Sequence, residues 1–272
     1  MKIKPIKIKN SIGKNIAAVI HYPKEQTSLP ATPFAARRWQ TDRLAILCPG
    51  YLDTKDYQHL IMLAEELAGD GYTVVRFDPT GTWESEGDIS DYTTTQYLND
   101  IRSVIKYMLS EGSYKFILIS GHSRGGMVSI LYAARDRRIS AVVGIMPSSG
   151  RKATGKRRED WEKDGFSISI RDIPNKTRSK TETKEFRVPF SHVLDRERYN
   201  VVEEAKNVGS PLIFIAGELD TVVLPQHVKE IFDMANEPKK FILLKKIGHD
   251  YRYNPDEIKI VNGEIIKCLR NI

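Results

Sequence analysis

The sequence has little cysteine and no long apolar run. Only two cysteines, Cys48 and Cys268, occur in 272 residues, and they lie far apart. This predicts neither a disulfide framework nor a cysteine-ligated metal site, and a reducing cytoplasmic location is expected. No apolar run reaches the roughly 18 residues that a membrane-spanning helix needs, so no span is expected.

The amino-terminal segment lacks the apolar stretch and small-residue cleavage site of a secretory signal. Residues 1–9 instead alternate lysine with apolar residues. That alternation predicts an amphipathic strand, which we expect to pair with residues 16–20 through a turn at 11–15.

Positive charge is in moderate excess and unevenly placed. The net charge is +7, and residues 151–198 hold fourteen Lys/Arg against nine Asp/Glu, which is +5 of it. The favoured interpretation is a solvated surface insertion. The alternative is a basic lid that attracts an anionic substrate. No nucleic-acid partner is expected, because no binding motif accompanies the charge.

Strand-like and helix-like segments alternate over most of the chain. Such alternation predicts one α/β domain with a mostly parallel central sheet and helices on both faces. The pattern breaks at residues 150–198, and residues 24–42 are expected to be a connection. The expected strands are 44–48, 72–77, 114–120, 141–146, 211–216 and 241–244. The expected helices are one around 60–67, closed by Gly69 and Gly71, and others near 93–110, 124–135, 200–207, 225–235 and 255–270.

The most informative motif is Gly121-His122-Ser123-Arg124-Gly125, between a predicted strand and a predicted helix. A G-x-S-x-G sequence in that context places a serine on a strained elbow, where the helix N-terminus offers free amides to an oxyanion. Alone, the pentapeptide also fits an ordinary strand-to-helix turn.

Two later strand ends carry the partners that such a serine needs. Asp220 follows the strand at 211–216, and His249 follows the strand at 241–244. Parallel sheets place their chemistry at the carboxyl ends of the strands. A serine hydroxyl needs an imidazole to remove its proton, and the imidazole needs a carboxylate to orient it. The order Ser123, Asp220, His249 is that of one serine-hydrolase architecture.

Alternatives to these partners exist. Spacing leaves Glu218 open beside Asp220, because an alternating path aims both side chains similarly. Asp250 adjoins His249 and cannot easily fold back to its ring. The other histidines, which are weaker candidates for the base, are His21, His59, His122, His192 and His227.

The oxyanion needs two amide donors. One is expected from Arg124, directly after the serine. The other is expected from Tyr51, in the loop Pro49-Gly50-Tyr51-Leu52 that follows an early strand. A plain turn with a packed tyrosine is the alternative for that loop.

In these motifs the chain resembles the α/β-hydrolase superfamily, and most of all its esterase branch of cinnamoyl and feruloyl esterases and related serine peptidases. The loop at 48–53 is similar to the family's H-G-x oxyanion loop, and residues 76–87 to its R-x-D-x-x-G-x-G-x-S-x-G stretch. The elbow, the Asp220 loop and the His249 loop also match, and the match favours Asp220 over Glu218. Pro49 replaces the usual histidine, and Trp83 replaces a usual glycine.

The resemblance implies an α/β-hydrolase fold with an inserted cap. Residues 1–149 and 199–272 would form the core. Residues 150–198 would form the cap (lid), since the family inserts it after the sixth strand of the sheet.

We therefore predict a serine hydrolase of carboxylic esters of small to medium acyl groups, acting on a small-molecule substrate with Ser123, His249 and Asp220. No metal or organic cofactor is required for this chemistry. Three alternatives stay open: an acyl-CoA thioesterase, a peptidase of short peptides, and a catalytically idle binding protein of hydrolase-like fold.

Overall fold

The computed structural model describes residues 1–23, 41–150, 156–174 and 182–272. The predicted connection at 24–42 lies almost wholly outside the described residues. Among those described, no helix has the length and apolar character to cross a membrane.

Eight of the described strands form one sheet, in the order β1-β2-β4-β3-β5-β6-β9-β10. β2 pairs antiparallel with β1 and β4, and all other neighbours pair in parallel. The central strands are apolar and buried on both faces, as parallel strands are when helices cover them. Their bounds are β1 Lys2–Lys9, β2 Asn15–Tyr22, β3 Arg43–Cys48, β4 Thr73–Phe77, β5 Phe116–His122, β6 Ala141–Ile145, β9 Leu212–Gly217 and β10 Lys239–Leu244.

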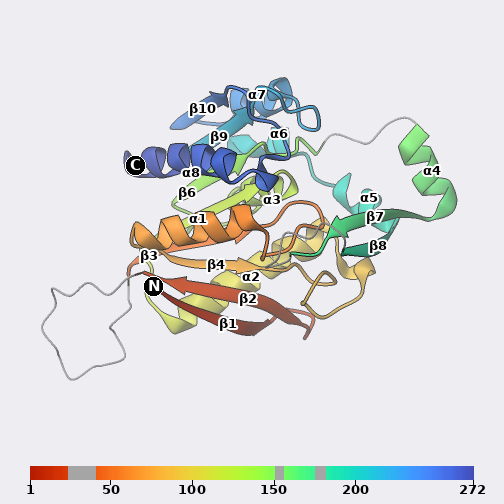
Figure 1. Cartoon of the computed structure of the whole chain (residues 1–272), viewed down its shortest axis with the longest axis horizontal. Coiled ribbons are helices and arrows are strands. Elements are labelled where there is room, and N and C mark those ends of the chain that lie inside the picture. Colours follow the sequence, from red (N-terminus) through yellow and green to blue (C-terminus); the bar gives the residue numbers. More distant parts are fainter. Residues whose placement is uncertain (24–40, 151–155, 175–181) are drawn as a thin grey trace, which may run out of the picture.

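Helices cover both faces of this sheet, which Figure 1 shows with α1 and α8 in front of the strands and α2 behind them. The two faces correspond to two separate apolar cores. One is packed under α1 and α8, and the other under α2, α3, α6 and α7. The helices are α1 Gln58–Gly69, α2 Thr94–Glu111, α3 Arg124–Ala133, α6 Val201–Glu204, α7 Pro225–Met234 and α8 Pro255–Leu269.

Local sequence explains where the long helices begin. The Thr93 side chain accepts a hydrogen bond from the Gln96 amide at the start of α2. At the start of α8, the Asn254 side chain accepts one from the Asp256 amide, and Pro255 occupies the first turn. Both are helix caps that satisfy amides without an intrahelical partner. Three short 3₁₀ turns complete the core: η2 Ile89–Asp91, η3 Ala205–Asn207 and η4 Tyr251–Tyr253.

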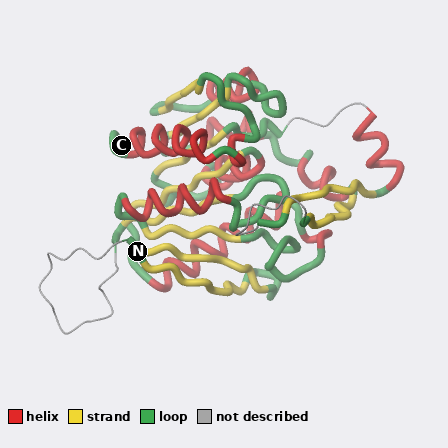
Figure 2. Tube along the Cα trace, viewed as in Figure 1, coloured by secondary structure: helices red, strands yellow, loops and turns green. Residues whose placement is uncertain are grey.

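Between β6 and α6 the chain leaves the main sheet and forms a small unit of its own. Strands β7 and β8 pair antiparallel as a separate two-stranded sheet. Figures 1 and 2 show this unit projecting beyond the end of the main sheet. Its elements are α4 Lys156–Asp164, β7 Phe166–Asp172, β8 Thr183–Pro189 and α5 Ser191–Arg196.

The sequence predicted the elements of the core within a few residues of their observed bounds. The α/β fold with a mostly parallel sheet and helices on both faces is confirmed. The β7–β8 pair was not predicted, although Phe166, Ile168 and Ile170 alternate with polar residues along β7 as in an amphipathic strand. Two of these apolar side chains, Ile168 and Ile170, are exposed. The assignment of 150–198 as a cap stays a prediction.

Candidate active site

Ser123 lies at the turn between β5 and α3 with a backbone φ of 55° and ψ of −118°. A non-glycine residue rarely adopts this conformation, and it persists only where the surrounding structure imposes it. Gly121 and Gly125 make the turn possible. A Cβ on Gly125 would collide with the carbonyl oxygen of Cys48, and one on Gly121 would collide with the backbone of Gly125. The serine therefore stands on the sharp elbow that the G-x-S-x-G motif predicted.

The structure brings Ser123, His249 and Asp220 together in one line of polar contacts. His249 Nε2 lies 3.0 Å from Ser123 Oγ, and His249 Nδ1 lies 2.7 Å from Asp220 Oδ2. These three residues come from loops after β5, β10 and β9, at the carboxyl ends of parallel strands. Both ring nitrogens of His249 therefore have a polar partner, one of them the serine hydroxyl.

Asp220 is fixed by its own loop. The amides of Val222 and Val223 each donate to Asp220 Oδ1 at 2.8 Å, which leaves Oδ2 for the imidazole. The Asp220 side chain is fully buried, whereas the His249 side chain is 12% exposed. The Asp220 carboxylate is thus shielded from water, whereas part of the His249 imidazole is accessible to solvent.

The structure separates the alternatives that spacing left open. Glu218 is exposed and accepts a hydrogen bond from the Lys246 amide, so it does not contact His249. Asp250 lies 3.8 Å from Arg252 Nε at the surface. His21 accepts a hydrogen bond from Arg76, and His192 contacts Arg124 and the Tyr92 carbonyl.

The amides of Tyr51 and Arg124 have no hydrogen-bond acceptor among the residues that the structure describes. Neighbouring amides in the same loop are used: Leu52 donates to the Tyr92 hydroxyl, and Asp53 donates to the Gly50 carbonyl. Arg124 is the first residue of α3, where helix geometry leaves the N–H without a partner. The two amides that the sequence singled out are therefore both unoccupied donors.

Trp83 has a structural role that the sequence did not reveal. Its backbone is in the left-handed region, which glycine favours, with φ of 45°. Its indole N–H donates to the Leu52 carbonyl at 2.9 Å, and its ring packs edge-on against Phe186 of β8. Trp83 thus joins the loop after β3 to the β7–β8 unit. The sequence indicated only that Trp83 stands where the resembled family usually has glycine.

Three further contacts bring the β7–β8 unit and α5 against the loops that carry the candidate site. Arg171 of β7 donates to the Tyr51 carbonyl at 3.0 Å. The Tyr51 ring packs on His192 of α5, with ring centroids 5.4 Å apart. The hydroxyl of Tyr253, after His249, donates to Asp172 Oδ1 at 2.9 Å. The segment after β6 therefore lies against both the Tyr51 loop and the His249 loop.

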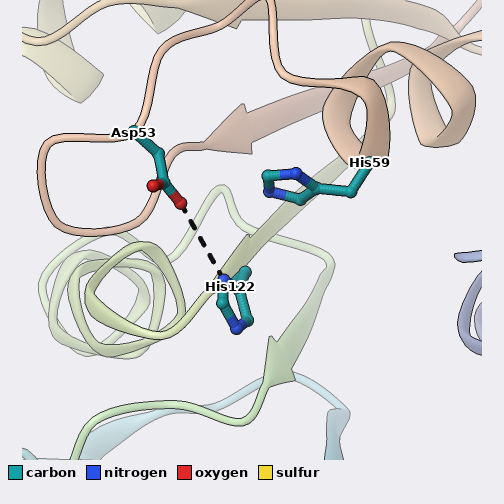
Figure 3. A group of neighbouring side chains, drawn as sticks. All are labelled: Asp53, His59 and His122. Carbon is teal, nitrogen blue, oxygen red and sulfur yellow. Dashed lines mark ion pairs between the residues drawn. The ribbon is translucent and has the colours of Figure 1, made fainter. Parts of the chain in front are cut away.

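A second group of titratable residues lies behind His249. Figure 3 shows Asp53, His59 and His122 turned toward one another, each from a different segment. Their ligand atoms lie within 4.8 Å of one another, and in the described part of the chain they are the one such grouping that could hold a metal ion. Both nitrogens of His59 and of His122 are buried without a hydrogen-bond partner.

Charge balance argues against a divalent ion in that group. Arg252 Nη1 already lies 3.5 Å from Asp53 Oδ1, so the single carboxylate faces a guanidinium. Adding a dication would leave a buried excess of positive charge, which is costly. Burial lowers the pKa of His59 to about 3 and that of His122 to about 4, so both rings are neutral at pH 7. We interpret Asp53, His59 and His122 as a structural group in which the neutral His122 ring packs against the His249 ring, with ring centroids 4.5 Å apart.

Comparison with known families concerns the fold of the chain. A family model described as the alpha/beta hydrolase fold matches residues 45–165. The resemblance to α/β hydrolases is thereby confirmed, and the chain has the α/β-hydrolase fold.

Individual relatives are distant. The chain is 23% identical to the mitochondrial palmitoyl-protein thioesterase ABHD10 of Mus musculus, over 84% of this chain and 74% of that protein. It spans only 64% of the human ABHD10. Among solved structures, the α/β hydrolase GrgF of a Penicillium species superposes with a TM-score of 0.77 at 18% identity, covering 97% of each chain. Est1E of Butyrivibrio proteoclasticus, solved with ferulic acid bound, gives 0.75 at 18% identity over 98% of each chain. These structural likenesses concern the fold.

Proposed function

We propose that the protein is a serine hydrolase of carboxylic esters, with Ser123 as nucleophile, His249 as base and acid, and Asp220 as the residue that orients His249. The observation that carries this proposal is the unbroken line of contacts from Asp220 through His249 to Ser123. The strained backbone of Ser123 supports it, because strain of this kind is kept where function needs the geometry. The esterase structures with the same fold support it further.

The proposed reaction has two steps, acylation of Ser123 and hydrolysis of the acyl-serine. Ser123 Oγ attacks the ester carbonyl carbon while His249 Nε2 takes the hydroxyl proton. The amides of Tyr51 and Arg124 donate to the oxyanion of the tetrahedral intermediate. The C–O bond to the alcohol then breaks, and His249 returns its proton to the departing oxygen. Water attacks the resulting acyl-serine by the same route and releases the acid.

Asp220 acts on His249 rather than on the substrate. Its Oδ2 accepts the Nδ1–H of the ring, which leaves Nε2 free to take the proton of Ser123. The carboxylate also stabilises the imidazolium that forms in each step. The residues 150–198 would cover this site as a cap, supported by the contacts of Arg171, His192 and Asp172 with the site loops.

Covalent labelling tests the assignment of the nucleophile. A fluorophosphonate probe should add one label to the wild-type protein at Ser123 and none to Ser123→Ala. The matched control is Ser103→Ala on α2, whose hydroxyl donates to the Asn99 carbonyl, and which should label as the wild type does. A labelled Ser123→Ala, or an unlabelled wild type, would contradict the proposal and favour an idle binding protein.

A second candidate is a thioesterase of long acyl chains. Two observations favour it: the distant likeness to palmitoyl-protein thioesterases, and the exposed apolar residues Leu219 and Val222 on either side of Asp220. Octanoyl and palmitoyl groups should be compared as thioesters and as oxygen esters of matched alcohols. Preference for the palmitoyl thioester would select this candidate, and preference for the shorter oxygen ester would select the esterase.

A further inference from the structure

The candidate site is bordered by an arginine cluster, formed by Arg124, Arg171 and Arg196. Arg124 directly follows Ser123, and its guanidinium lies 4.6 Å from the centroid of the Tyr92 ring. The Arg171 guanidinium lies 5.5 Å from the Tyr51 ring centroid, and the two tyrosine rings lie 6.1 Å apart. The cluster therefore lies close to Tyr51, whose amide is one of the two that we assign to the oxyanion.

The first two arginines of this cluster have no carboxylate partner among the residues that the structure describes. Arg124 is only 4% exposed, and its described side-chain contacts are neutral: the His192 ring, the Thr94 hydroxyl and the Tyr92 ring. Arg171 donates to a backbone carbonyl. Buried charges in proteins are almost always paired, because leaving one unpaired costs free energy.

The same residues carry unused donors. Nε of Arg124, Nε of Arg171 and the hydroxyl of Tyr51 are each buried without a hydrogen-bond partner. Burial, followed by the charge of Arg124, lowers the pKa of His192 well below its ordinary value, so this ring adds no charge. Burial and the charge of Arg124 also lower the pKa of Arg196, against an opposing effect of Glu197, so Arg124 and Arg196 lie close enough to repel each other.

The acidic residues nearest the cluster in sequence are committed elsewhere. Asp172 accepts from the hydroxyls of Tyr57 and Tyr253, and Asp195 accepts from Thr95. Glu197 pairs with Arg158 at 3.2 Å, and its charge also acts on Arg196, so the lack of a carboxylate concerns only Arg124 and Arg171 of the cluster. The described surroundings thus leave Arg124 and Arg171 without a carboxylate and three unused donors around the Tyr51 and Tyr92 rings.

We propose that the ester substrate carries an anionic oxygen group, a carboxylate or a phosphate-like group, a few atoms from the scissile carbonyl, and that the arginine cluster and the Tyr51 hydroxyl bind it. This inference rests on the proposed ester hydrolysis at Ser123. The planar fork of a guanidinium matches both groups and forms charge-assisted hydrogen bonds with them. Binding of the anion supplies the charge partner that Arg124 and Arg171 lack.

Matched esters test the proposal. Monoethyl succinate and ethyl 3-phosphonopropanoate carry a negative charge on the acyl part, and both are compared with the neutral ester ethyl butyrate. Carboxymethyl butyrate carries the charge on the alcohol part and is compared with the neutral ester propyl butyrate. In the wild type, at least one anionic ester should exceed its neutral counterpart in kcat/KM by roughly 10- to 100-fold, the value of charge-assisted hydrogen bonds. The best ester identifies the group and its position.

Variants assign any preference to the cluster. Arg171→Gln and Arg124→Lys should each lower the ratio of anionic to neutral kcat/KM by about tenfold or more. The matched control is Arg187→Gln on β8, where the guanidinium stacks 3.6 Å from the Phe166 ring centroid, and the ratio should stay that of the wild type. Arg171→Gln keeps the test possible if a change at the buried Arg124 prevents folding.

The outcomes distinguish the two proposals. If Ser123 labels and the neutral esters are hydrolysed, but no anionic ester is preferred, the anion site is overturned while ester hydrolysis stands. A preference that survives both cluster variants also overturns the anion site. Absence of Ser123 labelling and of all hydrolysis would instead overturn the proposed function itself.

Discussion

Two histidine–aspartate groups lie back to back in this protein, and they differ in what their ring nitrogens contact. His249 has Ser123 on one nitrogen and Asp220 on the other, and its side chain is partly exposed. His122, whose ring packs against that of His249 at an angle of 45°, has neither nitrogen in a hydrogen bond and is fully buried, although Asp53 Oδ2 lies 4.0 Å from its Nδ1. Each group pairs a histidine with an aspartate, but only the first includes a serine.

The difference shows that a histidine–aspartate pair alone does not decide the chemistry of a cluster. A proton moves only along polar atoms within hydrogen-bond reach, and a nucleophile must be reachable by substrate. The group at His249 satisfies both conditions, whereas the group at His122 satisfies neither. We expect the first to carry the reaction and the second to carry stability.

The largest expected effect compares the two neighbouring imidazole rings. His249→Gln should lower kcat for a short-chain ester by about 10⁶, the loss seen when a triad base is removed. His122→Gln should lower it by no more than about 100-fold, because only the placement of His249 is disturbed. The measurement is kcat at saturating substrate. Equal losses for the two variants would mean that His122 takes part in the reaction.

The two aspartates provide the next comparison. Asp220→Asn should lower kcat by about 10⁴, because the imidazole is left in the wrong tautomer. Asp53→Asn should instead lower the free energy of unfolding by up to about 3 kcal/mol, because it leaves the buried Arg252 without its nearest carboxylate. Urea denaturation and kcat are measured on both proteins. A loss of rate without a loss of stability in Asp53→Asn would assign Asp53 to the reaction instead of to the fold.

The buried histidines also predict how stability depends on pH. Burial lowers the pKa of His59 to about 3 and that of His122 to about 4 in the folded protein, while the unfolded chain keeps values near the ordinary 6.5. Between pH 6.5 and pH 4 the unfolded chain therefore binds more protons, so the free energy of unfolding falls as pH falls. Each histidine contributes about 1.4 kcal/mol per pH unit in that window.

His59→Phe isolates this effect, because phenylalanine keeps the ring packing and removes two unpartnered nitrogens. Urea denaturation at several pH values should give the variant a shallower pH dependence than the wild type. His227→Phe on α7 is the matched control and should keep the wild-type slope. An unchanged slope in His59→Phe would show that its pKa is not lowered by burial.

The smallest expected effect concerns the acid that spacing could not exclude. Glu218→Gln should change kcat by no more than about twofold, because Glu218 is exposed and contacts the Lys246 amide rather than His249. Kinetics of this variant beside Asp220→Asn measure the contrast directly. A large loss in Glu218→Gln would mean that Glu218, and not Asp220, is the functional carboxylate.

The sequence predicted the sheet, its helices and the meeting of Ser123, Asp220 and His249, because parallel strands bring their carboxyl ends to one edge. It could not choose between Asp220 and Glu218 from spacing, since the choice depends on a turn in which two amides hold Asp220. The contacts of Trp83 and the setting of Arg124 were also out of reach. Both depend on residues more than sixty positions away in the chain, such as Phe186 and His192.

The close approach of Gly125 to Cys48 has a mechanical consequence. The elbow that carries Ser123 and the loop that carries Tyr51 touch backbone to backbone, with no side chain between them to yield. The proposed nucleophile and the proposed oxyanion amide are therefore held close to each other by backbone contact. We expect a bulkier substrate to be admitted by movement of the β7–β8 unit and α5, which meet the site loops through side chains.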